Sequence, residues 1–392
     1  MSIIQKFRNS NFLRPFLHHK IIDIPREINA NRPVSTTRSG GGLMRTWILA
    51  LSLSLVSSLA IVGCGKSEAP ATGSGGGAGG GGGENAKKIA VIPKGTTDEF
   101  WLSIHAGAVK AQRELAGAGT HVEIVWQGPV VPNDTDKQIA IVENMINTNV
   151  SAIVLAPANA ESLADVVQTA DKRKIPVIII DSDLATDKYK SFVATDNYAG
   201  GKLAGESMAK LLNGKGRVIM LRHDKGQAST EKREQGFLDA IKASPDIQVV
   251  SSNQYGGPTA DTSYKNAENL LAGFKNADST LKADGIFASN EGATYGMLRA
   301  LQDLKATGKV KFIGFDASQA LVTALTAGEI DGLIVQDPVN MGYLGVKTAA
   351  DVLNGKTVER RMDTGVHLAT KANMETPEIK DLLHPPLDKY LK

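Results

Sequence analysis

Short apolar runs alternate with longer amphipathic stretches along most of the chain, from residue 88 onward. Short β-branched and apolar runs are typical of buried strands, and apolar residues spaced three or four apart are typical of helices. The apolar runs lie at residues 89–92, 122–126, 152–155, 177–180, 192–194, 218–221, 249–250, 286–288, 312–315 and 333–335. Ten strands are too many for one comfortable sheet, so we expect an α/β fold with two doubly wound parallel sheets, each covered by helices.

The N-terminal region has a different pattern, which predicts export. Met44 and Arg45 precede an apolar run over residues 47–62, which ends in Gly63-Cys64. At about 16 residues the run is shorter than the roughly 20 that span a bilayer, and a basic start is typical of a secretory signal peptide. We expect a signal over residues 44–63. Residues 1–43 are then either a long leader or the result of a start codon assigned too far upstream. We favour the second interpretation, in which Met44 is the true start.

Cys64 is the only cysteine and stands between the signal and a glycine-rich stretch. Residues 61–64 resemble a lipobox, which implies that Cys64 is lipidated and anchors the mature protein to a membrane. A buried free cysteine is the alternative. Residues 64–86 cannot bury enough apolar surface to offset their backbone entropy, so we expect a flexible tether there. A single cysteine also excludes an intrachain disulfide and a cysteine-based zinc cage.

The body of the chain is slightly acidic, which argues against nucleic acid as a partner. Residues 1–45 contain eight of the 44 Lys and Arg but only two of the 41 Asp and Glu, which leaves 36 basic and 39 acidic residues elsewhere. A phosphate backbone is bound by clustered Lys and Arg, and this balance does not offer them.

Catalytic signatures do not emerge from the sequence. It contains no HExxH motif, no G-x-S-x-G elbow and no pair of histidines at metal-binding spacing. We therefore expect no enzymatic activity, no metal and no cofactor. A glycosidase-like pair of Asp181 and Asp316 is a minor alternative, because it requires a raised pKa in one of the two carboxyls.

Amide and carboxylate side chains follow nearly every predicted strand. Ligands of open parallel sheets bind at the carboxyl ends of the strands. The segments found there are residues 96–101, 157–159, 181–183, 196–197, 222–224, 289–291, 316–318 and 336–337. Their polar groups suit vicinal hydroxyls, and Phe100 with Trp101 offers flat apolar faces for a sugar ring. Helix capping accounts equally well for any single Asp or Asn, and core packing is an alternative for the two aromatics. Neither explanation accounts for the whole set.

Several of these segments resemble, in the same order, the periplasmic sugar-binding proteins of the ribose, allose and galactose group. They are IAVIPKGTTDEFW at 89–101, IPVIIID at 175–181, ATDN at 194–197, REQGF at 233–237, IFASN at 286–290, IGFD at 313–316 and VQ at 335–336. The resemblance covers residues 87 to about 372. It implies the type 1 periplasmic binding protein fold, in which a three-strand hinge joins one lobe (87–195 plus 337–365) to a second (196–336 plus 366–392).

The resemblance also implies a function and a set of partners. The protein is expected to be a periplasmic, membrane-anchored monomer that delivers a monosaccharide to the permease and ATPase of an ABC importer. Phe100 and Trp101 match the aromatic pair that sandwiches the sugar ring, and Asp98 stands where the ribose pattern has an asparagine. The hydroxyl-binding groups are matched by Asp181, Asn290, Asp316 and Gln336.

Departures from the ribose pattern argue against ribose itself. Ala156 stands where that pattern has an asparagine, and no phenylalanine falls at its third aromatic position, where Tyr255 or Tyr264 are the alternatives. Ser182 and Glu231 stand where that pattern has two arginines, so both cationic anchors are expected to be lost and the cleft to be more negative. Ser182 and Glu231 are kept in the expected ligand-binding set. A buried carboxylate needs a partner, so the ligand is expected to carry an amine, as in an amino sugar, or to be a larger sugar whose hydroxyls satisfy Glu231.

Two other functions share this fold. A transcriptional repressor needs a helix-turn-helix ahead of the first lobe, where this chain has a signal, Cys64 and a tether. A sensory subunit, which delivers its closed complex to a chemoreceptor or a sensor kinase, is an open alternative to transport. For transport and for sensing alike, the expected mechanism is capture by hinge closure, because a ligand that bridges both lobes shifts the population toward the closed form.

Overall fold

The computed structural model describes residues 86–278 and 280–392. The expected leader (1–43), signal (44–63), lipidated Cys64 and tether (64–86) lie outside these ranges, apart from residue 86. Across the part of the chain that is described, no helix is both long enough and apolar enough to cross a membrane.

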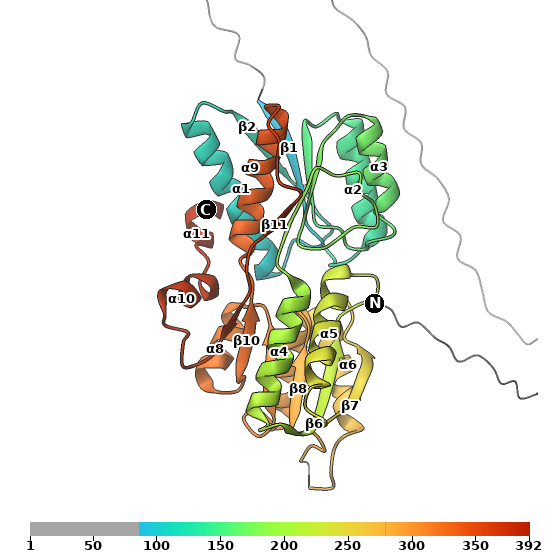
Figure 1. The fold of residues 1–392 in the computed structure, drawn as a ribbon, viewed down its shortest axis with the longest axis vertical. Helices are drawn as coiled ribbons and strands as arrows, with labels where there is room; N and C mark the ends of the chain where they lie inside the picture. The colour runs from blue at the N-terminus through green and yellow to red at the C-terminus, as the bar shows by residue number, and fades with distance from the viewer. Residues whose placement is uncertain (1–85, 279) are drawn as a thin grey trace, which may run out of the picture. The chain divides into compact units, whose positions relative to one another are not determined.

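Two six-stranded sheets organise the described residues, as the apolar pattern predicted (Figure 1). The first sheet has the order β11-β5-β4-β3-β1-β2, and all of its neighbouring strands are parallel. Its strands are β1 (Lys87–Ile92), β2 (Val122–Trp126), β3 (Ala152–Leu155), β4 (Val177–Ile180), β5 (Ser191–Ala194) and β11 (Arg361–Asp363). The strands β3, β4 and β5 are buried along their whole length, which explains their unbroken apolar runs.

The second sheet repeats this order with β12-β10-β9-β8-β6-β7. Its strands are β6 (Lys215–Arg222), β7 (Asp246–Tyr255), β8 (Gly285–Ala288), β9 (Lys311–Phe315), β10 (Gly332–Val335) and β12 (His367–Ala369). Here β12 runs antiparallel to β10, whereas only parallel pairs were expected. The apolar pattern also missed β11 and β12, which are three residues long and carry no readable period.

Helices cover both faces of each sheet. The first lobe, meaning the first sheet with its helices, has α1 and α9 on one face and α2 and α3 on the other. The second lobe has α4 and α5 on one face and α6, α7, α8 and α10 on the other. The first-lobe helices are α1 (Glu99–Gly117), α2 (Thr135–Asn147), α3 (Ala164–Lys172) and α9 (Pro338–Leu353). The others are α4 (Asn197–Leu211), α5 (Ala228–Ile241), α6 (Ala260–Ala272), α7 (Glu291–Asp303), α8 (Gln319–Ala327), α10 (Pro377–Leu383) and α11 (Leu387–Leu391).

The chain passes between the two sheets at three places. It leaves the first sheet after β5, returns after β10 to form α9, and passes once more between β11 and β12. Two of these crossings are joined directly, because the Thr195 hydroxyl donates to the carbonyl of Gly365 at 3.1 Å and the Asp196 N–H donates to Asp363 at 3.2 Å. The first and third crossings are therefore held side by side.

Close packing of α1 against α9 fixes the start of α1, where the predicted aromatic pair lies. Gly107 in α1 and Gly342 in α9 allow this approach, because a Cβ at Gly107 would overlap the carbonyl of Val339 and a Cβ at Gly342 would overlap that of Ile104. Two helix backbones in contact leave little freedom for rotation or sliding. Phe100 and Trp101, in the first turn of α1, are thereby held in place.

Replacement of Gly107 by alanine tests this packing. Gly107→Ala should lower the free energy of unfolding by about 2 kcal/mol or more, because an added Cβ forces the two backbones apart. Gly117→Ala is the matched control in the same helix. Nothing lies within 4 Å of its added Cβ, so it should be neutral or stabilise by up to about 1 kcal/mol. Urea unfolding of both variants measures the difference, and equal losses would contradict the role given to Gly107.

Candidate functional site

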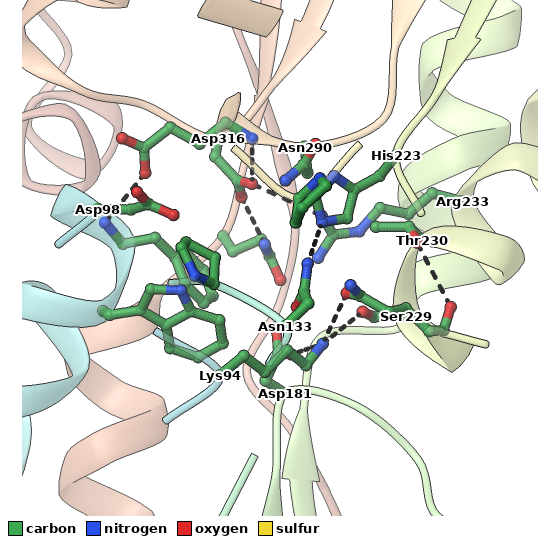
Figure 2. Close-up of a pocket in the computed structure, with 17 residues that line it drawn as sticks. Lys94, Asp98, Asn133, Asp181, His223, Ser229, Thr230, Arg233, Asn290 and Asp316 are labelled. Carbon is green, nitrogen blue, oxygen red and sulfur yellow. Dashed lines mark hydrogen bonds and ion pairs between the residues drawn. The ribbon is translucent and has the colours of Figure 1, made fainter. Parts of the chain in front are cut away.

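A cleft between the lobes brings together strand-end residues from both sheets (Figure 2). Seven of the nine residues predicted to bind ligand line it, namely Asp98, Phe100, Trp101, Asp181, Asn290, Asp316 and Gln336. The carboxyl ends of the parallel strands in both sheets face this cleft, as expected for doubly wound folds. Residues up to 242 positions apart in the sequence, Lys94 and Gln336, thus share one cavity.

Asp181 and Asp316 occupy equivalent positions in the two lobes. Each follows a buried strand directly, Asp181 after β4 and Asp316 after β9, and each has a positive φ, 61° and 69° respectively. Left-handed backbone is uncommon for residues other than glycine and tends to mark functional sites. This turn aims both buried carboxyls into the cleft.

Asp181 forms a buried ion pair with Lys94, a residue that the sequence analysis missed. The Lys94 ammonium lies 2.7 Å from Asp181 Oδ2, and both residues are only 3% exposed. The ammonium also donates across the cleft to Ser229 Oγ at 3.2 Å and Gln227 Oε1 at 3.4 Å. Burial lowers the pKa of Lys94, and the neighbouring carboxylate of Asp181 opposes that shift. Lys94 follows β1 by two residues, so a strand-end search that began there instead of at Thr96 would have found it.

Asp316 faces the second buried cation of the cleft, Arg233 of α5. Arg233 Nη1 lies 3.6 Å from Asp316 Oδ2, and its guanidinium is fixed by bonds to Asn197 Oδ1 at 2.7 Å and the Ser289 carbonyl at 3.1 Å. The guanidinium also stacks over the Phe315 ring at 3.9 Å. Burial raises the pKa of Asp316, and the positive charge of Arg233 opposes that shift.

Lys94 and Arg233 therefore give the cleft two cations, although Ser182 and Glu231 stand where the ribose pattern has arginines, and neither Ser182 nor Glu231 lines the cleft. Glu231 is exposed and accepts a hydrogen bond from the Gly226 N–H at 2.9 Å. Only the face of α5 with Ser229, Thr230 and Arg233 lines the cleft, and Glu231 lies on the opposite side of the helix. Ser182 is buried but does not line the cleft; its hydroxyl accepts from the Ser229 N–H at 3.1 Å and so links the lobes.

Phe100 and Trp101 form an apolar wall of the cleft. Their rings meet edge to face, with centroids 4.9 Å apart and an interplanar angle of 89°, and the residues are 8% and 7% exposed. The Trp101 ring lies 5.9 Å from the Lys94 ammonium. Aromatic faces beside charged groups suit a ligand that is apolar on one side and polar at its edge.

Two further carboxyls, Asp98 and Glu291, line the cleft without a cation. Among the described residues, neither has a Lys, Arg or His nitrogen within 4 Å of its carboxylate. Glu291 accepts a hydrogen bond across the cleft from the Phe100 N–H at 3.1 Å. Burial raises the pKa of Glu291 well above its usual value, and the negative charges of Asp98 and Asp316 raise it further. Burial also raises the pKa of Asp98. Glu291 follows a predicted strand, but it was not among the residues expected to bind ligand.

His223 and Asn133 close one side of the cleft. Their side chains, one from each lobe, lie 2.9 Å apart between Asn133 Nδ2 and His223 Nε2. Burial, together with the nearby charges of Lys94 and Arg233, lowers the pKa of His223 to about 3. His223 is therefore a neutral hydrogen-bonding group at physiological pH.

Helix capping and ligand binding, weighed above as alternatives, coexist at Asn290. Its side-chain oxygen accepts from the Ala293 N–H at 3.1 Å and caps α7, while the residue also lines the cleft. Asp337 caps α9 through the Asn340 N–H at 2.9 Å and does not line the cleft. Within residues 86–278 and 280–392, no three His, Cys, Asp or Glu side chains are arranged to hold a metal ion.

Comparison with known protein families agrees with this architecture. A family model described as a periplasmic binding protein domain matches residues 89–357. The ribose import binding protein of Haemophilus influenzae is 33% identical over 274 residues, which cover 70% of this chain and 88% of the relative. The D-ribose/D-allose-binding protein of Pseudomonas aeruginosa is 30% identical over 293 residues, which cover 72% and 88%.

Solved structures of transporter proteins share the fold. A carbohydrate transporter solute-binding protein from Agrobacterium radiobacter, in complex with D-arabinose, has a TM-score of 0.71 and 36% identity and covers 77% of this chain and 100% of its own. An ABC transporter solute-binding protein from Agrobacterium vitis, with bound D-fucose, has a TM-score of 0.71 and 35% identity and covers 76% and 100%. The chain belongs to the periplasmic binding protein family, in its ribose and allose group of sugar-binding proteins.

Proposed function

We propose that this protein captures a neutral monosaccharide in the cleft, closes its two lobes around the sugar and delivers it to the permease and ATPase of an ABC importer. Family members are solute-binding components of transporters rather than enzymes. The sugars named for these relatives include ribose, D-arabinose and D-fucose. These sugars are all uncharged and small, which suits a cavity enclosed on two sides.

The observation that carries the proposal is a set of buried polar atoms that have no partner within the described chain. They are Gln336 Oε1, Gln227 Nε2 and His223 Nδ1, and all three residues line the cleft. An unsatisfied buried polar atom costs about 1–3 kcal/mol, so three such atoms in one cleft support a site where water or a bound ligand supplies their partners. Sugar hydroxyls donate and accept at once, and can therefore satisfy amide, imidazole and carboxylate atoms together.

The two buried ion pairs give this site its rigidity. Lys94 and Arg233 hold the carboxylates of Asp181 and Asp316 in place while leaving oxygen lone pairs for ligand hydroxyls. Phe100 and Trp101 supply the face on which the sugar ring stacks. Lys94 also contacts the second lobe through Ser229, so its interactions are complete only when the lobes meet. Ligand binding and lobe closure are thus coupled through the same residues.

An amine-bearing ligand is less well supported than a neutral sugar. That hypothesis rested on Glu231 in the cleft and on the loss of both cations, whereas Glu231 faces solvent and Lys94 and Arg233 are present. Asp98 and Glu291 are the carboxyls that could still receive an ammonium group, so an amino sugar belongs in any ligand panel.

We further propose that the mature protein is a monomer tethered in the periplasm by a lipid on Cys64. The family implies a location outside the cytoplasm. The lipid rests on the sequence around Cys64, where a short apolar run precedes the cysteine and glycine-rich residues follow it. Mass spectrometry of the protein isolated from membranes tests this proposal, because Cys64→Ser should remove the added lipid mass and release the protein from the membrane.

A ligand panel tests the proposed sugar site. Thermal shift with D-ribose, D-allose, D-arabinose, D-fucose and glucosamine, followed by calorimetric titration of the best ligand, should give binding by at least one neutral sugar. Asp316→Asn should weaken that binding about 10- to 100-fold, because hydrogen bonds to a charged group contribute about 1.5–3 kcal/mol. Glu231→Gln is the control and should bind like the wild type. Stabilisation by glucosamine alone, or an equal loss in the control, would count against the proposal.

Glu291 predicts that sugar affinity depends on pH. Closure buries this carboxyl and raises its pKa, so the closed form takes up a proton. Below the ordinary pKa of glutamate, Glu291 is protonated in both the open and the closed form, and its contribution to closure is fully present. This contribution is lost as the pH rises through the raised pKa of the closed form. Affinity for a neutral sugar should therefore fall as the pH is raised above the ordinary pKa of glutamate, about 4.3, by at most about tenfold per pH unit.

Glu291→Gln separates this effect from other titrations, because glutamine keeps an acceptor for the Phe100 N–H and cannot ionise. Calorimetric titration across the same pH range should show a flatter profile for Glu291→Gln than for the wild type. Glu231→Gln should keep the wild-type profile. Parallel profiles for the wild type and Glu291→Gln would show that Glu291 does not carry the dependence.

A further inference from the structure

The C-terminal segment, residues 370–392, lies beyond the match to the family model, which ends at residue 357. Its first part packs on the second lobe. Ile379 and Leu383 of α10 are 5% and 3% exposed, and both belong to the hydrophobic core that α7 and α8 form on the second sheet. Met374, just ahead of α10, is buried in the same core. This part of the segment is therefore an integral element of the second lobe.

The last part of the segment packs on the first lobe. Helix α11 contacts α1 (Figure 1), and its Leu387, Tyr390 and Leu391 are half-buried. These three residues share one helix face, because they lie at positions i, i+3 and i+4. Arg113 of α1 donates to the carbonyls of Lys389 at 2.8 Å and Tyr390 at 3.2 Å, and its guanidinium lies 5.5 Å from the centre of the Tyr390 ring. Arg113 thereby holds the end of the chain on the first lobe.

Only residues 384–386, His-Pro-Pro, join these two attachments. An extended chain spans at most about 3.3–3.6 Å per residue, and the proline rings fix φ at both positions. Pro385 also lines a small cavity together with Phe100 at the start of α1 and with Gln336 and Pro338, where the chain crosses between the lobes. The link is therefore short, stiff and close to the hinge.

We propose that residues 370–392 are a strap that limits how far the two lobes open and biases the ligand-free protein toward closure. Opening moves α1 away from the core of the second lobe, so either α11 must leave α1 or the link must lengthen. Residues 384–386 cannot lengthen much, and the contacts between Arg113 and α11 are therefore lost in the open form. Such a contact, present in one state and absent in the other, shifts the equilibrium between them.

This inference rests on the lobe closure proposed above, and it competes with a simpler role in which α11 only covers α1 and stabilises the first lobe. Two variants separate the two roles. Deletion of residues 385–392 removes α11 and its link. Insertion of four glycines between Pro385 and Pro386 keeps both attachments and only lengthens the link.

Small-angle X-ray scattering of the ligand-free proteins gives the decisive measurement. Both the deletion and the insertion should increase the radius of gyration relative to the wild type, and D-arabinose, the probe sugar, should bind about 3- to 10-fold more weakly to both. Arg299→Gln is the matched control. Its guanidinium also lies over a tyrosine, Tyr264, at 4.4 Å and pairs with Asp261, but all three residues belong to the second lobe. It should leave the radius of gyration unchanged.

The possible results decide between the roles. An unchanged radius for the insertion variant, with a lower melting temperature for the deletion alone, would overturn the strap and leave α11 as a cover for α1. An insertion variant that does not contract on addition of a sugar that binds it would instead sink the proposed closure. In that case the ligand-free comparison still decides the strap, because a loosened strap must expand the ligand-free protein and an inert segment cannot.

Discussion

Two buried aspartates, each facing a buried cation, set the constraint on which the rest of this structure depends. Removing a charge from water costs several kcal/mol per ion, and only a close partner with further hydrogen bonds repays it. Asp181 therefore needs Lys94 from the end of β1, and Asp316 needs Arg233 from α5. The left-handed backbone at both aspartates is tolerable because the strand ahead of each one is locked in a buried sheet. The strand order places both aspartates at the carboxyl ends of their sheets, where these ends face the cleft.

The same constraint couples the lobes. Lys94 belongs to the first lobe, but its ammonium donates to Ser229 and Gln227 of the second. Glu291 of the second lobe accepts from the backbone of Phe100 in the first, and it does so without a cation. Closure thus completes the hydrogen bonds of the Lys94 ammonium, and it also buries the Glu291 carboxyl, whose raised pKa favours the protonated form. A neutral sugar fits this balance, because its hydroxyls serve both kinds of group without adding charge.

The repeated architecture explains why one cleft can hold so many polar groups. Both sheets have the same strand order, and each delivers its strand ends to the shared cleft. Helix packing then decides which side chains reach it. Gly107 and Gly342 bring α1 against α9 and fix the aromatic wall, while the rotation of α5 about its axis presents Arg233 to the cleft and Glu231 to solvent. The C-terminal segment adds contacts to both lobes beyond the part that the family model covers.

The sequence by itself determined the fold class and the ten longer strands, because burial and helical or strand period are local properties that a pattern records. The seven residues that line the cleft followed from their positions at strand ends and from the resemblance to sugar-binding proteins. It could not reveal β11 and β12, since three residues are too few to show a period. Tertiary structure decided that Lys94 and Arg233 are the cations of the site and that Ser182 and Glu231 lie outside it. Those outcomes depend on how elements distant in sequence pack together. Which face of α5 meets the first lobe cannot be predicted from the sequence of α5 or of the first lobe alone.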